Sequence, residues 1–392
     1  MAEREREVAL IMNINKPYDR KVVEGVARFT RTKSDWCVYA EDEPLAKIPD
    51  LSRWKGHGII ADLDDASVVE AITGLQIPVV NIGGAIHDES WSFDTPYVTT
   101  DNFAVAQLAA EHLLDRGFQN FAYCGLKKTP FNPWSRIRSK VFQKAVNDRG
   151  FDCSIYRGRH NDPRRWEEVQ QSLCRWLEPL PKPLGLFACN DARARHVLES
   201  CRRLGLRVPD DVAILGVDND EMMCELANPA LSSIELGTDR IGFEAASLLD
   251  DLMAGKRVSK KRRWVEAAPV GVVMRASTNA LAVDDNDVAE AIVYIRDHVG
   301  RGVQVSEVTT HVDLSRSTLD NRFKAQLGRS VHDEIERARL ELVKSMLLNT
   351  TLTLAEISKQ TGFGTVQYMA TVFRRSTGHT PGQFRQLHQR ER

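Results

Sequence analysis

Acidic and amide side chains recur in this chain directly after short apolar runs, where they could hydrogen-bond a small polar molecule. Asp191 follows the run Leu-Phe-Ala-Cys-Asn, and Asp218 follows Ile-Leu-Gly-Val. A carboxylate accepts two hydroxyl hydrogens, and an amide both donates and accepts, so this pattern predicts binding of a polyhydroxylated ligand. The equivalent position after other apolar runs is held by Tyr18, Asp19 and Asp101.

Each of these residues also has a second explanation, because Asp and Asn are favoured N-caps of helices. For any single Asp or Asn, the cap and the ligand contact explain the residue equally well. Asp191 and Asp218 stand out, because each ends a strand-like run that we expect to be buried.

Strand-like apolar runs alternate with amphipathic stretches of helix length from Val8 to about Thr278. The alternation predicts an α/β fold with doubly wound parallel sheets, which bind small molecules outside the carboxyl ends of their strands. The predicted strands are Val8–Ile14, Gly58–Ala61, Val79–Ile82, Phe121–Tyr123, Leu184–Ala188 and Val212–Val217. The predicted helices are Arg20–Thr32, Ala104–Asp115, Ile137–Asp148, Arg164–Leu177, Ala192–Leu204 and Arg240–Leu252.

The order of these segments resembles the sugar-sensing core of LacI/GalR repressors, which is itself similar to periplasmic sugar-binding proteins. The resemblance is carried by Asn190-Asp191, by the segment from Gly205 to Asp218 and by Arg275-Ala-Ser-Thr278. It implies a two-lobed periplasmic-binding-protein-like sensor in which Asp191, Asp218 and Arg138 contact sugar hydroxyls. Trp134, just upstream of Arg138, either stacks on a sugar face or anchors a loop.

The C-terminal part of the chain contains two helix-turn-helix patterns, of which the second is the clearer. A short helix that carries Ile357 ends at Gly362, and Phe363 fills the turn. Met369 and Phe373, four residues apart, form the buried side of the next helix. Polar and basic groups on its other face suit recognition of the DNA major groove. The predicted DNA-binding residues of this helix are Thr365, Gln367, Tyr368, Thr371, Arg374 and Arg375.

The first copy begins at Val305 and repeats this pattern, with Leu319 and Phe323 as its buried pair. Between the copies, residues 330–349 are predicted to form one helix with an apolar stripe that includes Ile335 and Leu342. Such a helix is about 30 Å long, close to one turn of B-DNA, and could hold two recognition helices in successive major grooves. The predicted DNA-binding residues of the first copy are Arg316, Ser317, Thr318, Asn321 and Lys324.

Residues 287–385 resemble the DNA-binding domain of the AraC family of transcription activators. The Gly-Phe turn at Gly362, the Phe-Arg-Arg run from Phe373 and the pair Thr380-Pro381 carry the resemblance. It implies an all-α domain with tandem helix-turn-helix motifs; a small helical interaction module is the weaker alternative. Met369, Thr371 and Asn321 depart from the residues usual in that family, which affects the bases recognised and not the fold.

The bulk properties argue against several other classes of protein. The chain has 392 residues and a net charge of −1, so we expect roughly two or three domains. Its seven cysteines are scattered without a Cys-x-x-Cys pair, and no signal peptide or long apolar run is present. These features predict a cytoplasmic protein without a metal site. Because no dinucleotide or P-loop glycine motif stands out, we expect no cofactor and no enzyme activity.

LacI/GalR repressors carry their DNA-binding unit before the sensor, whereas this chain carries it after the sensor. A LacI-like sensor joined to an AraC-like domain, together with the segment from Asn13 to Arg20, resembles a family of xylose-responsive regulators. We therefore expect residues 1–280 to form a two-lobed sugar-binding domain, 281–286 a linker and 287–392 the DNA-binding domain.

The predicted function is a sugar-responsive transcription regulator that activates transcription as a homodimer. Its expected partners are an operator in DNA, a sugar effector for which D-xylose is favoured, and RNA polymerase if it is an activator. No membrane partner is expected. The alternatives are a regulator of the same architecture that senses another sugar or a purine, or one that acts as a repressor.

Overall fold

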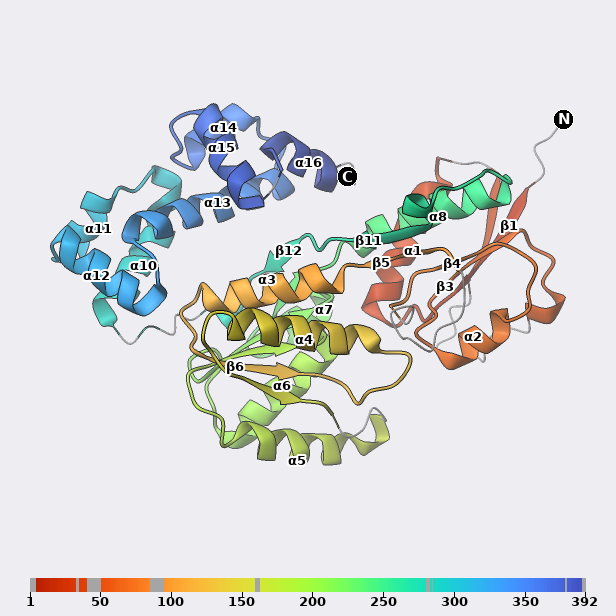
Figure 1. Ribbon diagram of the computed structural model, residues 1–392, viewed down its shortest axis with the longest axis horizontal. Coiled ribbons are helices and arrows are strands. Elements are labelled where there is room, and N and C mark those ends of the chain that lie inside the picture. Colours follow the sequence, from red (N-terminus) through yellow and green to blue (C-terminus); the bar gives the residue numbers. More distant parts are fainter. Residues whose placement is uncertain are drawn as a thin grey trace. The chain divides into compact units, whose positions relative to one another are not determined.

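The computed structural model describes residues 5–32, 35–40, 51–84, 95–158, 163–279, 283, 285–377 and 379–389. The chain forms two compact units, one made of Met1–Leu114 with Phe118–Ala280 and the other of Asp115–Gly117 with Leu281–Arg392 (Figure 1). Of the predicted linker 281–286, residues 281, 282 and 284 lie outside the described part. Asp285 is the N-cap of the first helix of the second unit.

The first lobe of the larger unit is built on a parallel sheet whose residues point alternately to two buried faces. Val8 and Leu10 pack on one side of it, and Ala9 and Ile11 pack on the other, which explains why the strands are continuously apolar. The strands in spatial order are β11 (Trp264–Ala267), β5 (Tyr97–Thr100), β4 (Val79–Asn81), β3 (Gly58–Ala61), β1 (Arg6–Ile11) and β2 (Trp36–Ala40). The helices are α1 (Pro17–Thr30), α2 (Ala66–Ile72), α8 (Thr238–Met253) and α9 (Lys260–Arg263), with a 3-10 turn at Leu51–Arg53.

The second lobe has a second sheet, which is parallel except that its edge strand β12 runs antiparallel to β10. The strands in spatial order are β12 (Gly271–Val273), β10 (Ser232–Glu235), β9 (Val212–Val217), β8 (Leu184–Ala188), β6 (Asn120–Cys124) and β7 (Cys153–Tyr156). The helices are α3 (Asn102–Leu114), α4 (Pro133–Asn147), α5 (Trp166–Leu177), α6 (Asp191–Leu204) and α7 (Glu221–Leu226), with 3-10 turns at Pro163–Arg165 and Ala276–Thr278.

Within the described residues, the chain passes between the two sheets after β5, after β10 and after β11. The predicted α/β class with two doubly wound lobes is confirmed. The four edge strands β2, β7, β11 and β12 were not among the predicted strands, nor were β5 and β10. Edge strands are buried less completely than central ones, so they lack the long apolar run that marks a central strand. The first strand also ends at Ile11, earlier than predicted.

The smaller unit is entirely helical in its described residues and contains both predicted helix-turn-helix motifs. Leu319, Phe323, Met369 and Phe373 are fully buried, as predicted. The helix that joins the motifs buries Ile335 of the predicted stripe together with Val331, Leu340 and Val343, whereas Leu342 is only partly buried. The helices are α10 (Asn286–His298), α11 (Val305–His311), α12 (Arg316–Leu327), α13 (Val331–Asn349), α14 (Leu354–Gln360), α15 (Val366–Thr377) and α16 (Pro381–Gln389), with a 3-10 turn at Val299–Arg301. Among the described residues, no helix combines the length and apolar character needed to cross a lipid bilayer.

Candidate ligand site and nucleic-acid interface

Asp218 is the residue whose geometry points most directly to a ligand. It follows β9 with a backbone φ of +106°, a region that non-glycine residues rarely occupy and that costs conformational energy. Its carboxylate is partly buried, and no donor from the described part of the chain bonds to it. Burial, reinforced by the charge of Asp191, raises the pKa of Asp218 to about 8. A strained residue that presents an unpaired carboxylate is suited to accept hydrogen bonds from a ligand.

Asp191 differs, because its carboxylate is already used by the protein. Ser233 Oγ donates to Oδ1 at 2.6 Å, while the backbone N of Asp220 at 3.0 Å and Cys224 Sγ at 3.5 Å donate to Oδ2. The residue is 3% exposed, and burial raises the pKa of Asp191 to about 6 against the effect of these donors. The direct sugar contact predicted for Asp191 stays a prediction; in the structure its carboxylate faces the protein and bonds to Ser233, Asp220 and Cys224.

Arg138 and Trp134 lie on α4 beside the same turn. Arg138 is buried and donates from Nε to Asn102 Oδ1 at 2.8 Å and from Nη1 to the carbonyl of Cys189 at 2.6 Å. Its guanidinium carbon lies 5.0 Å from the centre of the Trp134 ring. A Cβ on Gly84 in the first lobe would meet Trp134 Cδ1 at 3.2 Å. Trp134 thus lies where the two lobes meet, a position compatible with either of its two predicted roles.

Tyr18 and Asp19 begin α1, on the first-lobe side of this junction. Tyr18 donates to the carbonyl of Ile82 at 2.9 Å, and burial raises its pKa. Asp19 is fully buried and accepts from the backbone N of Asn13 at 2.8 Å, whereas its Oδ1 has no partner. Burial, followed by the charge of Asp62, raises the pKa of the Asp19 carboxyl well above its usual range. Asp19 therefore keeps an acceptor oxygen for which the described residues supply no donor.

Asp101 serves as a helix cap. Its Oδ1 accepts from the backbone N of Ala104 at 2.9 Å, directly before α3 begins. The structure therefore shows the capping role of Asp101, whereas its predicted ligand contact stays a prediction. The other residues whose predicted ligand contacts stay predictions are Tyr18, Asp19, Trp134, Arg138, Asp191 and Asp218.

Several residues of the junction were not predicted from the sequence. Lys16 Nζ bonds Asp62 Oδ2 at 2.8 Å, and a Cβ on Gly83 would lie 2.6 Å from the other oxygen of Asp62. Burial disfavours the charge of Lys16, but Asp62, Asp19 and Asp64 outweigh burial and raise its pKa. Asp62 directly follows β3. The pattern that identified Asp218, an acidic residue directly after a buried strand, could therefore have identified Asp62 as well. Lys16 follows no strand, and only the fold brings it to Asp62.

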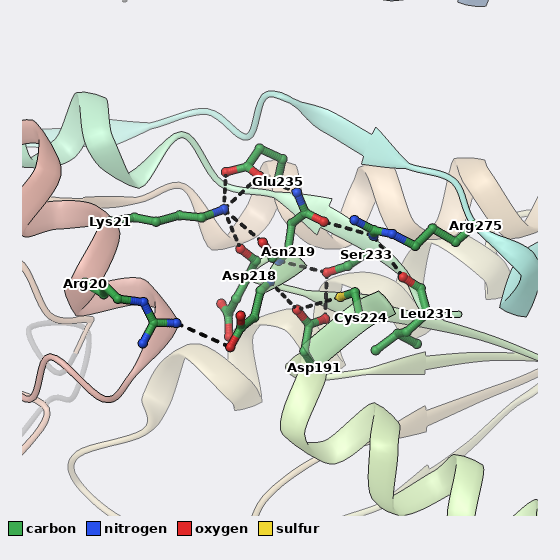
Figure 2. A network of polar contacts seen from close by, with 11 residues as sticks. Arg20, Lys21, Asp191, Asp218, Asn219, Cys224, Leu231, Ser233, Glu235 and Arg275 are labelled. Carbon is green, nitrogen blue, oxygen red and sulfur yellow. Dashed lines mark hydrogen bonds and ion pairs between the residues drawn. The ribbon is translucent and has the colours of Figure 1, made fainter. Parts of the chain in front are cut away.

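A polar network links the first lobe to the Asp218 turn (Figure 2). Lys21 of α1 donates to both carboxylate oxygens of Glu235, at 3.1 and 2.9 Å, and to the carbonyls of Asp218 at 3.3 Å and Asn219 at 2.9 Å. The neighbouring Arg20 lies 3.5 Å from Asp220. A helix of one lobe therefore holds the turn that the other lobe presents.

The predicted DNA-binding residues of the smaller unit are all exposed. In the first motif, the side chains of Asn321 and Lys324 have no hydrogen-bond partner within the described residues. In the second motif the same is true of the Gln367 and Arg374 side chains, which are thus available to bases and phosphates. Arg375 and Tyr368 are instead both tied to Glu336 of α13, at 2.6 and 3.3 Å.

The geometry so far defines a class: a ligand-binding sensor of the periplasmic-binding-protein type joined to a tandem helix-turn-helix unit, that is, a ligand-responsive transcription regulator. Family models agree. Residues 110–278 match a periplasmic binding protein-like domain, 7–103 a XylR N-terminal domain and 308–387 a helix-turn-helix domain.

The chain belongs to the family of xylose operon regulatory proteins. It is 35% identical to the xylose operon regulatory protein of Escherichia coli K12, over 99% of this chain and 98% of that protein. It is 34% identical to the protein of the same name from Haemophilus influenzae, over 98% and 99% of the two chains. A solved structure described as the xylose-binding transcription activator xylR aligns with a TM-score of 0.65 and 34% identity, over 99% of both chains.

Proposed function

We propose that this chain is a D-xylose-responsive transcription regulator whose sugar site lies where the two lobes meet, around Asp218. The single observation that carries the site is the strained, unpaired carboxylate of Asp218. Asp19 offers a second free acceptor oxygen from the opposite lobe. A polyhydroxylated ligand would donate to the Asp218 carboxylate and to Asp19 Oδ1, for which the described residues supply no donor. The choice of D-xylose rests on the names of the relatives.

The second part of the proposal is that sugar binding changes how the tandem helix-turn-helix unit meets operator DNA. A ligand shifts such an equilibrium only by binding one arrangement more tightly, with typical couplings of about 1–3 kcal/mol. We further propose that the protein activates transcription through RNA polymerase and acts as a homodimer in the cytoplasm. The related solved structure is described as that of an activator, which supports the sign of regulation.

Isothermal calorimetry with D-xylose, other pentoses and hexoses tests the sugar site. We expect Asp218→Asn to weaken D-xylose binding at least tenfold, because a charge-assisted hydrogen bond contributes about 1.5–3 kcal/mol. Asp211→Asn is the matched control: Asp211 precedes the same strand at its opposite end, where it pairs with Arg207 at 2.9 Å. Unchanged affinity in Asp218→Asn would refute the site, and binding of a different sugar by the unmodified protein would refute only the choice of D-xylose.

A further inference from the structure

Arg275 stands at the point where the chain leaves the sensor. It precedes the 3-10 turn Ala276–Thr278, the last element of the larger unit before the chain continues to α10. Its guanidinium is largely buried, with a side-chain exposure of 11%. Nη1 donates to Asn219 Oδ1 at 2.9 Å and to the carbonyl of Leu231 at 3.0 Å, and Nε donates to Glu225 at 2.6 Å. The side chain therefore reaches back from the exit of the sensor to the turn beside Asp218.

In this turn Arg275 contacts Asn219. Both polar atoms of the Asn219 side chain and its backbone N are hydrogen-bonded. Its Oδ1 accepts from Arg275, its Nδ2 donates to Glu235 Oε2 at 2.7 Å, and its backbone N donates to Ser233 Oγ at 3.0 Å. The residue is 3% exposed and has a φ of +46°. Because Asn219 directly follows Asp218, a ligand that moves Asp218 must also move the group that Arg275 bonds.

The far end of the same network lies in the first lobe. Glu235, which accepts from Asn219, also accepts two hydrogen bonds from Lys21 of α1 (Figure 2). Arg275 is thus connected, through two intervening side chains, to the helix that faces the second lobe. A change in the distance between the lobes would alter the contacts of Glu235, and a change in the Asp218 turn would alter the position of Asn219. Both changes would affect Arg275 through its hydrogen bond with Asn219.

The backbone around Arg275 is held firmly on β10. Arg275 N donates to Ser232 Oγ at 2.8 Å, and the Ser232 hydroxyl donates to the Arg275 carbonyl at 3.0 Å. Ser277 Oγ donates to the carbonyl of Ile214 at 2.6 Å and accepts from Ser232 N at 2.8 Å. Because these bonds fix the backbone of Arg275–Thr278 to the sheet, this segment moves with the sheet. The Arg275 side chain instead moves with the Asp218–Asp220 turn that it bonds.

We propose that Arg275 is a positioning residue for the sugar response, which couples the Asp218–Asp220 turn to the segment leading to the DNA-binding unit. The inference rests on the proposed function, since the signal that Arg275 transmits is occupation of the sugar site. Arg275 has no role in holding the sugar. Its removal should therefore separate sugar binding from the sugar-dependent change in DNA affinity.

The test uses the full-length protein and its Arg275→Met and Arg275→Lys variants. D-xylose affinity is measured by calorimetry, and DNA affinity with and without D-xylose on a duplex selected from random sequence by the unmodified protein. We expect the unmodified protein to change its DNA affinity about 5- to 150-fold with sugar, the usual range of such couplings. In both variants we expect D-xylose affinity within about threefold of the unmodified protein and a sugar-dependent ratio close to one, as expected when a coupling element is lost.

Two controls separate this role from a structural one. Arg203→Met removes an arginine with comparable ion pairs, to Glu167 at 3.0 Å and Glu199 at 2.9 Å, on another part of the lobe, and should keep the full response. Glu225→Gln removes only the charge of the exposed partner of Arg275, a glutamate with 66% side-chain exposure. This variant should also keep the sugar-dependent change in DNA affinity.

A full sugar response in Arg275→Met or Arg275→Lys overturns the inference, as does loss of the response in Arg203→Met. If Arg275→Met fails to fold by circular dichroism, Arg275→Lys decides, because it retains the charge and the packing but not the paired geometry. Absence of D-xylose binding by the unmodified protein would instead contradict the proposed function.

Discussion

Ser233 Oγ donates a hydrogen bond of 2.6 Å to Asp191 Oδ1 and accepts one of 3.0 Å from the backbone N of Asn219. Asp191 is thereby linked to two residues of the turn after β9: through Ser233 to Asn219, and directly to Asp220, whose backbone N donates to it. Gly216 makes this close approach possible: a Cβ there would lie 2.2 Å from Asp191 Oδ1. Asp191, one of the two carboxylates predicted to contact the ligand, thus also supports the turn that carries the other, Asp218.

Asp191→Asn should lower stability more than it changes ligand chemistry. An amide in place of the carboxylate puts an NH₂ group against donors, so a buried donor loses its acceptor at a cost of about 1–3 kcal/mol in the free energy of unfolding. Urea denaturation measures this cost, with Asp211→Asn as a control that should stay within about 0.5 kcal/mol of the unmodified protein. If stability is unchanged while D-xylose binding disappears, Asp191 contacts the sugar directly after all.

The contribution of Asp218 and Asp191 to the stability of the unliganded protein should fall as pH rises between about 4 and about 8. The pKa of Asp218 is raised to about 8 and that of Asp191 to about 6, so the folded state binds protons more tightly than the unfolded chain. Protonation of these two carboxyls stabilises the folded state fully at a pH below their pKa in the unfolded chain. This stabilisation is lost as the pH rises through their pKa values in the folded state. Thermal melting from pH 5 to pH 9 should show this decline, with a shallower slope in Asp218→Asn. An identical slope in that variant contradicts the prediction.

Gln367→Ala should relax base preference. The Gln367 side chain is exposed and free of partners in the described structure, and a bidentate contact of an amide with adenine contributes about 1–3 kcal/mol of discrimination. Selection of binding sites from random DNA by the variant should yield a less defined base at one position of the half-site. Equal loss of affinity for selected and random DNA would mean that Gln367 contacts the backbone.

Arg374→Ala should weaken binding to all sequences equally and reduce the salt dependence. One phosphate contact fewer lowers the slope of log K against log salt by about 0.9. Arg375→Ala is the comparison: Arg375 is already paired with Glu336 at 2.6 Å, so its loss should change the slope less. Titrations of DNA at several salt concentrations distinguish the two variants. If Arg375→Ala changed the slope more than Arg374→Ala, Arg375 would be the phosphate contact and Arg374 would not.

Local patterns in the sequence were sufficient where neighbours along the chain determine the outcome. Leu319 with Phe323 and Met369 with Phe373 are buried because residues four apart share one face of a helix. Gly362 adopts a φ of +71° in the turn where its break was predicted. Central strands such as β8 and β9 were found because both of their faces are covered, which requires continuous apolar runs.

The amino-acid sequence by itself indicated an α/β sensor followed by an all-α region with two helix-turn-helix motifs, and the edge of the sheets at which polar residues gather. Only the tertiary structure decided which of those residues is free to bind. Asp101 and Asp191 follow strands just as Asp218 does, yet Ala104 donates to one oxygen of Asp101, Ser233 donates to Asp191, and no side-chain or backbone donor in the described chain bonds the Asp218 carboxylate. The physical reason is that a hydrogen bond is made or left unmade by partners distant in sequence, as with Arg275 and Asn219, which no local periodicity encodes.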